Sequence, residues 1–307
     1  MRGSERVFKD GAIQHIYQNT VGGFLIFYTV RDYLVLFSLL SIAARKYNVK
    51  ILGVCLMPDH IHILAIAERE QDLSQFVCYY TSQFVLLYNP TVNRTGQFFR
   101  HSFGSAVKTT DKKSRFAIAY LYNNLVEKQL ADDVESGQWN FLQYAIRDAP
   151  FSAPIDSAKA RRPMRKAMQL IRINREQDIP LNYALIERMT KPLTAMEKRQ
   201  LTDYTIQQYN CIDYPEVIKY FGSYNAMVTA FNTTTGSEYD VREVHHKESD
   251  AIYQTITKYL LKHYPISNIK DIFFLEEGER KRIAVAVARK TRAPWFQIAK
   301  FFHLPPP

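Results

Sequence analysis

Two histidines separated by one apolar residue lie in the segment Met57-Pro58-Asp59-His60-Ile61-His62-Ile63-Leu64. On a β-strand, residues two apart project from the same face, so His60 and His62 would point together while Ile61 and Ile63 face the other side. Two imidazoles on one face form half of a site for a divalent cation. The spacing also arises by chance, and in isolation an ordinary pair of strand histidines is the better interpretation.

A second group of candidate residues follows on a predicted helix, in Tyr120-Leu121-Tyr122-Asn123-Asn124. Tyr120 and Asn124 are one helical turn apart and share a face. A free tyrosine has a pKa near 10 and is a poor nucleophile at neutral pH. A cation held by histidines can polarise a phosphodiester, so that the phenol oxygen attacks phosphorus and forms a phosphotyrosine. The amide oxygen of Asn124 could complete the ligands, and Mg²⁺ or Mn²⁺ fits such a site.

Each of these residues also has a plainer interpretation. The chain contains 20 tyrosines, and many must simply pack in the core. Tyr122 competes as nucleophile, although it lies about 200° around the helix from Tyr120. The side chain of Asn124 could instead bond to the backbone of its own helix. His15 and His101 are close to the predicted active strands, and for each we expect a structural role or a phosphate contact.

The elements that would position these residues follow the order β-α-β-β-α-β with a further helix. We predict strands over 13–20, 49–56, 60–67 and part of 97–108, and helices over 32–47, 73–88 and 112–130, with Asp32 as the first N-cap. This order is typical of the ferredoxin-like split βαβ arrangement, an α+β fold with an antiparallel sheet. In that fold the histidines lie on a central strand, and the last helix can cross the same face.

We predict a catalytic domain over residues 1–148, a linker over 149–163 with three prolines, and an all-helical extension over 164–307. The extension should contain helices at 164–175, 182–189, 195–209, 214–220, 224–231 and 249–263. Its end, 279–304, should form two short helices around Arg292-Ala293-Pro294. These two helices resemble the beginning of a helix-turn-helix, which makes the module a partial one.

The composition favours a polyanionic partner. Lysine and arginine total 40 against 30 acidic residues, a formal net charge of +10, and such a surplus is typical of nucleic-acid-binding proteins. Cations that flank the predicted site or line the last helices are the candidate DNA contacts: Arg94, Arg100, Lys108, Lys112, Lys113, Arg115, Arg280, Arg282, Arg289 and Lys290.

The remaining composition argues for a protein of the reducing cytoplasm, associated with the nucleoid. The 3 cysteines, Cys55, Cys78 and Cys211, are scattered and form no disulfide framework. There is no uninterrupted apolar window of membrane-spanning length and no signal-peptide core. We therefore expect no membrane partner and no small-molecule cofactor, and homodimerisation is left open.

The motifs resemble a known family. Met57 to Leu64 resembles the "MPNHVHLL" signature of the single-tyrosine HUH transposases, and Tyr120 to Val126 resembles the "YIHxNPV" segment of their REP-associated, IS200-like branch. Thr95 to Phe99 lies between them, where that family has a "TGxLFQ"-like stretch. The resemblance covers roughly residues 13–130. It implies the ferredoxin-like fold, with His60 and His62 as metal ligands, Tyr120 as nucleophile and Asn124 as third ligand.

The resemblance also implies an activity. The family cuts single-stranded DNA near a hairpin, leaves a 5′-phosphotyrosine and a free 3′-OH, and rejoins strands without an external energy source. We therefore expect a metal-dependent DNA transposase that acts on single-stranded hairpin DNA. Two alternatives remain: a transposase-derived DNA-binding regulator with little catalysis, and a nuclease of the relaxase or replication-initiator type. The second alternative more often carries a helicase module, and the sequence has no GxxxxGK[ST] motif.

Overall fold

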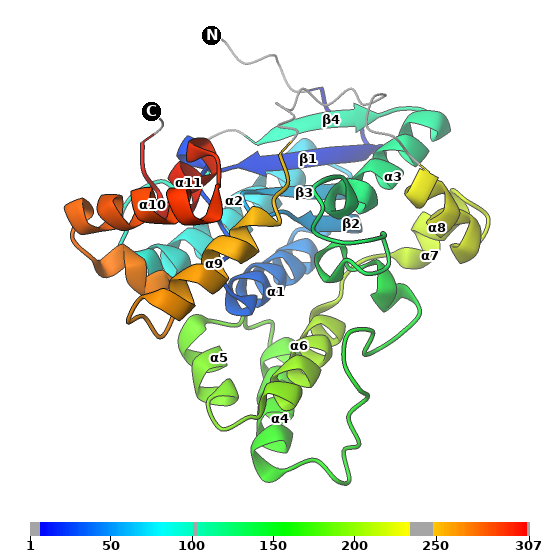
Figure 1. The fold of residues 1–307 in the computed structure, drawn as a ribbon. Coiled ribbons are helices and arrows are strands. Elements are labelled where there is room, and N and C mark those ends of the chain that lie inside the picture. Colours follow the sequence, from blue (N-terminus) through cyan, green and yellow to red (C-terminus); the bar gives the residue numbers. More distant parts are fainter. Residues whose placement is uncertain (1–6, 101–102, 234–247, 306–307) are drawn as a thin grey trace.

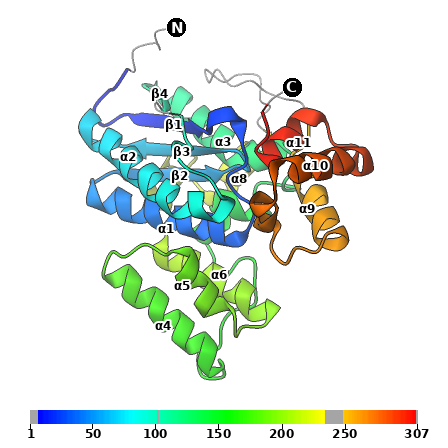
Figure 2. The same cartoon turned by 90° about the vertical axis from the view of Figure 1, so that its left-hand side faces the viewer.

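The computed structural model describes residues 7–100, 103–233 and 248–305. At its centre is an antiparallel sheet with the strand order β2-β3-β1-β4 (Figure 1). The strands are β1 (Ile13–Asn19), β2 (Lys50–Leu56), β3 (His60–Ile66) and β4 (Gly104–Lys108). Helices α1 (Val30–Lys46) and α2 (Glu70–Tyr88) cover one face, and α3 (Asp111–Glu127) covers the other (Figures 1 and 2). This is the predicted ferredoxin-like split βαβ fold.

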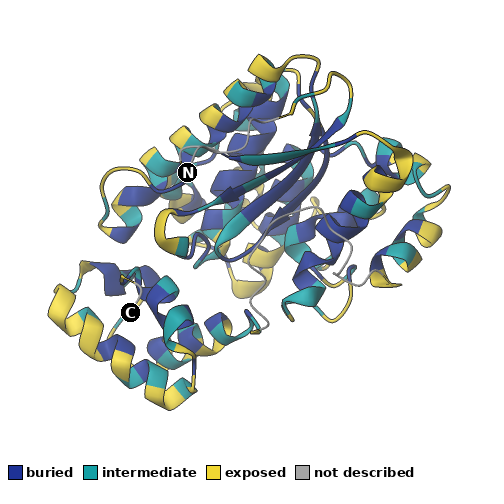
Figure 3. Cartoon of the chain, turned by 90° about the horizontal axis from the view of Figure 1, so that it is seen from above, coloured by how far each residue is buried: buried dark blue, intermediate teal, exposed yellow. Residues whose placement is uncertain are grey.

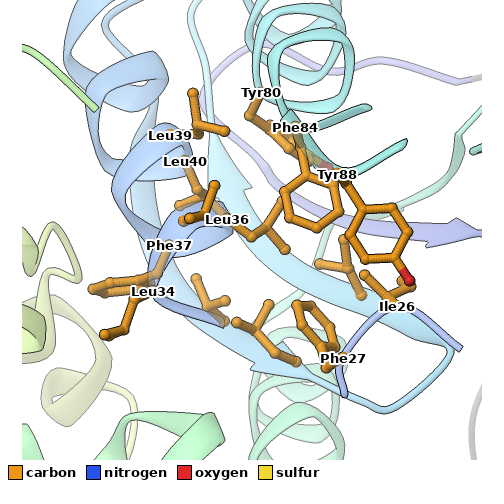
Figure 4. Close-up of a cluster of buried hydrophobic side chains, with 14 of the residues drawn as sticks. Ile26, Phe27, Leu34, Leu36, Phe37, Leu39, Leu40, Tyr80, Phe84 and Tyr88 are labelled. Carbon is orange, nitrogen blue, oxygen red and sulfur yellow. The ribbon is translucent and has the colours of Figure 1, made fainter. Parts of the chain in front are cut away.

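The two faces of β3 carry different side chains, as the alternation predicted. Ile61 and Ile63 are fully buried in the core formed with α1 and α2. Leu64 belongs instead to the cluster packed against α3. On the first side, aromatic and aliphatic side chains of α1 and α2 interdigitate over the sheet, with Leu36, Leu40 and Phe84 among them (Figure 4). This core fixes the sheet and therefore the direction in which the histidines project.

Helix α1 begins two residues before the predicted position. Its N-cap is Thr29, and Asp32 is the third helical residue of a capping box, so the prediction of Asp32 as N-cap was wrong. The Asp32 carboxylate accepts hydrogen bonds from the backbone N–H groups of Tyr28 at 3.0 Å and Thr29 at 2.8 Å. A carboxylate in the first turn satisfies these donors and complements the helix dipole.

Strand β4 lies within residues 97–108, where a strand was predicted. Phe98 and Phe99 are buried before the strand begins, and Phe99 forms an isolated bridge with Thr20. The strand begins at Gly104, over which the ring of Tyr17 lies. A Cβ atom at Gly104 would be 1.7 Å from a ring carbon of Tyr17, so only glycine permits this contact.

Beyond the sheet the chain is helical, as predicted, and residues 149–161 form neither helix nor strand. The helices are α4 (Arg162–Glu176), α5 (Tyr183–Thr190), α6 (Ala195–Tyr209), α7 (Tyr214–Lys219), α8 (Tyr224–Thr233), α9 (Ile252–His263), α10 (Glu277–Thr291) and α11 (Trp295–Phe302). Short 3-10 helices span Val21–Gly23, Asn89–Val92, Gln138–Asn140, Leu142–Ala145 and Ile269–Phe274.

The helical extension packs directly on the sheet domain. Leu201 and Ile206 of α6 belong to the same buried cluster as Phe37 of α1, and Ile212 forms a parallel bridge with Ile51 of β2. Helices α9 to α11 lie at the end of the sheet where β1 finishes (Figures 1 and 2). The burial pattern follows this packing, because β1, β2, β3 and the inner faces of the helices are mostly buried, whereas the edge strand β4 is only partly buried (Figure 3). The predicted boundaries of domain and linker stay a prediction.

Across the described ranges, no helix combines the length and apolar character needed to cross a membrane.

Candidate active site

The candidate site lies between the sheet and α3. In the sheet register His62 is opposite Tyr17 on β1 and Cys55 on β2, and His60 is opposite Asn19. Residues directly opposite one another share a face. His62 lies in ring contact with Tyr120 of α3, so the histidines of β3 project on the face that α3 covers. The strand pattern and the helix spacing thus bring the two motifs together.

Tyr120 contacts two histidine rings. Its ring centroid is 5.7 Å from that of His62 and 5.8 Å from that of His15, and both pairs meet edge to face. His15 Nε2 and His62 Nδ1 are 3.0 Å apart and share a hydrogen bond. All three side chains are fully buried. The site therefore includes a third histidine, in direct contact with two of the predicted residues.

The sequence predicts for His15 only a structural role or a phosphate contact. Its place follows from the pairing of β1 with β3, in which His15 lies opposite Leu64 and diagonal to His62. The alternation of β1 put His15 on one of two faces, but only the strand order and register say which. His101, the other histidine considered, lies outside the described residues.

Tyr122 has a different environment from Tyr120. Its hydroxyl donates to the backbone carbonyl of Leu52 at 3.1 Å, and its ring stacks on Phe231 with centroids 5.0 Å apart. Burial raises the pKa of Tyr122 well above the usual value. Gly53 allows α3 to come this close, because a Cβ there would be 3.0 Å from Leu121. Tyr122 thus anchors α3 to β2, away from the histidines.

Asn124 is buried on the same helix, one turn after Tyr120. Its side-chain nitrogen donates to the carbonyl of Tyr120 at 2.9 Å, so the local backbone bond that competes with a ligand role is present. This bond uses the amide nitrogen. A metal-ligand role would use the amide oxygen, and the two roles are chemically compatible.

His60 is held by its neighbour in the turn between β2 and β3. Its Nδ1 donates to Asp59 Oδ1 at 2.6 Å. The other carboxylate oxygen of Asp59 accepts from the ammonium of Lys300 at 2.6 Å, and Lys300 belongs to α11. Burial alone would raise the pKa of Asp59, but His60 and Lys300 together lower it well below its usual value. Asp59 is therefore ionised and engaged on both oxygens.

One further carboxyl group lies in the electrostatic field of this turn. Burial raises the pKa of Asp250 to about 6, and the negative charge of Asp59 adds to the effect, while His60 and Lys300 oppose it. The backbone N–H of Asp250 donates to the carbonyl of Lys128 just after α3 at 3.1 Å. Nothing in the sequence around Asp250 indicated this position, because α9 and α11 reach the turn only through the tertiary fold.

The predicted DNA-contacting cations differ in exposure. Lys108 is buried. The guanidinium of Arg94 lies 5.4 Å from the ring centroid of Phe24 and 5.6 Å from that of Phe98, and Arg280 is half-buried. The others are exposed: Arg100, Lys112, Lys113, Arg115, Arg282, Arg289 and Lys290.

The residues predicted to bind a cation are His60, His62 and Asn124. Among the residues that the structure describes, no group of three or more histidine, cysteine, aspartate or glutamate side chains could hold a metal ion. The predicted ligands are instead two imidazoles and one amide. Nδ1 of His60 bonds a carboxylate, and Nδ1 of His62 bonds a second imidazole. Such outer partners are typical of metal-binding histidines, so these residues could hold a divalent cation.

Comparison with known proteins gives one family. Residues 27–124 match the family model described as "Transposase IS200 like", which confirms the resemblance drawn from the motifs. A solved REP-associated tyrosine transposase bound to a REP hairpin is similar at 18% identity, covering 48% of this chain and 87% of that chain, with a TM-score of 0.42. No curated protein matches.

Proposed function

We propose that this protein is a DNA transposase that cuts and rejoins single-stranded DNA through a phosphotyrosine on Tyr120, with an Mg²⁺ or Mn²⁺ ion bound by His60, His62 and Asn124. The observation that carries the proposal is the edge-to-face contact between the Tyr120 and His62 rings, at 5.7 Å. It joins the two motifs on one face of the sheet. The IS200-like match of residues 27–124, which includes all four residues, supports the same assignment.

The reaction follows from the residues in this arrangement. The phenol oxygen of Tyr120 attacks the phosphorus and gives up its proton, the bond between phosphorus and the 3′ oxygen breaks, and that oxygen takes up a proton and leaves as a free 3′-OH. A cation bound by the two imidazoles and the Asn124 oxygen would polarise the phosphate and stabilise the charge on the leaving oxygen. The phosphotyrosine retains a phosphodiester bond. A 3′-OH can therefore attack it and release Tyr120, which rejoins strands without another energy source.

Proton positions on the histidines suit this scheme. With a proton on Nδ1 of His60, donated to Asp59 at 2.6 Å, the lone pair is on Nε2. With a proton on Nδ1 of His62, donated to His15 at 3.0 Å, Nε2 of His62 likewise carries the lone pair. His15 and Asp59 are then positioning residues, because each fixes the tautomer and ring orientation of one ligand.

Full burial of Tyr120 adds a requirement. A DNA phosphate must reach the phenol oxygen, so α3 or the segments that cover it must open before cleavage. DNA binding can supply the free energy for that opening if the strand binds the open state better. The exposed cations at the beginning of α3, Lys112, Lys113 and Arg115, are the proposed backbone contacts nearest to Tyr120 in sequence.

The same burial favours one competing function. A transposase-derived regulator would keep the fold and the basic surface, and its Tyr120 would stay closed. Such a protein would bind hairpin DNA tightly without a metal ion and would form no covalent product. The two functions make opposite predictions for a single assay.

The test is a denaturing-gel adduct assay with single-stranded hairpins from the DNA that flanks this gene, in the presence of Mn²⁺. Wild-type protein is compared with Tyr120→Phe, and Tyr122→Phe is the matched control from the same helix. We expect an adduct that is lost only in Tyr120→Phe. Loss only in Tyr122→Phe would reassign the nucleophile. Tight hairpin binding without any adduct would support the regulator.

A further inference from the structure

The C-terminal helix α11 reaches the turn that carries His60. Lys300 is 241 residues away from Asp59 in sequence, yet its ammonium nitrogen is 2.6 Å from Asp59 Oδ2. The side chains of Lys300 and Asp59 are 22% and 12% exposed, so the pair is mostly shielded from water. An ion pair in that setting is screened less than one on the surface, and it holds its geometry more strongly.

The position of Lys300 is fixed by its helix and not only by the ion pair. The backbone carbonyl of the next residue, Phe301, accepts from the hydroxyl of Tyr28 at 2.5 Å. The carbonyl of Lys300 itself accepts from the backbone N–H of Leu25 at 3.3 Å. Phe301 is almost completely buried. Helix α11 is thus docked on residues 24–28, the loop that leads into α1.

That loop is itself bonded to the histidine turn. The backbone N–H of Ile26 donates to the carbonyl of Pro58 at 2.7 Å. The loop on which α11 is docked is therefore hydrogen-bonded to Pro58, the residue before Asp59. The figures agree with this arrangement, since α11 lies beside the end of the sheet at which β1 finishes (Figures 1 and 2).

We infer that Lys300 is a positioning residue of the metal site: it holds Asp59, and Asp59 orients His60. The inference rests on the proposed function. Asp59 Oδ1 accepts the Nδ1 proton of His60 at 2.6 Å, and Lys300 occupies the opposite oxygen. Without Lys300 the carboxylate can rotate and release that proton, so that the ring of His60 loses its fixed tautomer and direction. The helical extension then contributes directly to the catalytic centre.

Two measurements on the full chain test this inference. The first is the affinity for Mn²⁺ alone, followed by the electron paramagnetic resonance signal of the free ion. The second is the ¹⁵N spectrum of histidine-labelled, metal-free protein, with the His60 ring signals assigned by His60→Gln. The proteins are wild type, Lys300→Met, Lys300→Arg and Lys262→Met, where Lys262 is an exposed lysine of α9 that serves as the control.

We expect Lys300→Met to weaken Mn²⁺ binding about 10–100-fold, the usual loss when an outer partner of a ligand is removed. We also expect it to move the His60 ring signals toward a mixture of tautomers. Lys300→Arg should restore both, and Lys262→Met should match wild type. In an Asp59→Asn background, Lys300→Met should cause no further loss, because the lysine acts through Asp59.

A folded Lys300→Met protein with wild-type Mn²⁺ affinity and unchanged His60 signals would overturn the inference. If Lys300→Met does not fold, Lys300→Gln takes its place in the same comparison. A wild-type protein that binds no Mn²⁺ would contradict the proposed function instead. The His60 spectrum needs no metal, so it would still decide whether Lys300 orients the ring.

Discussion

The buried ammonium of Lys270 contacts the carboxylate of Asp32, which joins the extension to the beginning of α1. Asp32 also accepts from the hydroxyl of Tyr183 at 2.8 Å, and Thr91 accepts from Lys270 at 2.9 Å. The Asp32 and Lys270 side chains are 0% and 6% exposed. Four segments that are distant in sequence therefore meet at one ion pair, which holds the loop of residues 24–28 in place for α11.

Removal of Lys270 should destabilise the protein strongly. In Lys270→Met the Asp32 charge stays buried without its cation, and we expect the free energy of unfolding to fall by about 3 kcal/mol. Urea denaturation measures this loss. Lys262→Met, on the exposed surface of α9, should change it by less than about 0.5 kcal/mol. A loss below about 1 kcal/mol in Lys270→Met would mean that the hydrogen bonds of Asp32 suffice without the ion pair.

Substitution of each of the two tyrosines of α3 should distinguish an effect on folding stability from an effect on adduct formation. Tyr122→Phe removes a buried hydrogen bond to the Leu52 carbonyl and should cost about 1–2 kcal/mol of unfolding free energy. Adduct formation should persist in this variant. Tyr120→Phe should abolish the adduct while the protein stays folded, as circular dichroism and thermal melting can check. Equal loss of the adduct in both variants would show that the helix, and not one hydroxyl, is needed.

His303 should make the protein sensitive to acid. Burial lowers its pKa to about 3, although a hydrogen bond from Nε2 to the Leu25 carbonyl opposes the shift. The unfolded chain takes up this proton below pH 6.5 and the folded chain does not, so stability is lost as pH falls from about 6.5 toward 3. At pH 4.5 the loss should be roughly 2–3 kcal/mol relative to pH 7.5.

The matched variant for this pH dependence is His303→Gln, which keeps a donor but does not titrate. The difference in unfolding free energy between wild type and variant, measured from pH 7.5 to 4.5, isolates His303 from the other groups. Two parallel curves would mean that His303 gains its proton in the folded protein.

Gly104 should be intolerant of a side chain. A Cβ there would meet the Tyr17 ring at 1.7 Å, so Gly104→Ala must displace the ring, at a cost of about 1–3 kcal/mol. Tyr17→Ala in the same background should recover part of that loss. Gly278→Ala is the control, because a Cβ at Gly278 would have no neighbouring atom within 4 Å. Thermal unfolding of the four proteins measures these changes. A Gly104→Ala protein as stable as wild type would contradict the close contact between Gly104 and the Tyr17 ring.

Local patterns were sufficient to predict the elements that carry the candidate site. The alternation around His60 and His62 identified strand β3 and its two faces, and the spacing of Tyr120 and Asn124 indicated one face of a helix. Both patterns depend only on backbone periodicity. The strand predicted within residues 97–108 is present as β4, and the apolar residues Phe98 and Phe99 before it are buried in the core without belonging to that strand.

The contacts of His15 and Lys300 could not be predicted in the same way. His15 reaches His62 through the register of two strands that are not consecutive. Lys300 reaches Asp59 through the docking of a helix from the far end of the chain. Neither contact follows from a local periodicity of the sequence, because both depend on which surfaces pack together in the folded chain. The two helices on either side of Arg292 were predicted from sequence, but the burial of Phe301 and Phe302 against the fold was not.

The separation of 241 positions between Asp59 and Lys300 has a consequence for synthesis. A ribosome makes the histidine turn first, and Lys300, the cation that pairs with Asp59, is added 241 positions later. A prematurely terminated product would contain every residue of the two motifs and still lack this contact. The immediate environment of His60 is therefore complete only in chains that have been translated at least as far as Lys300.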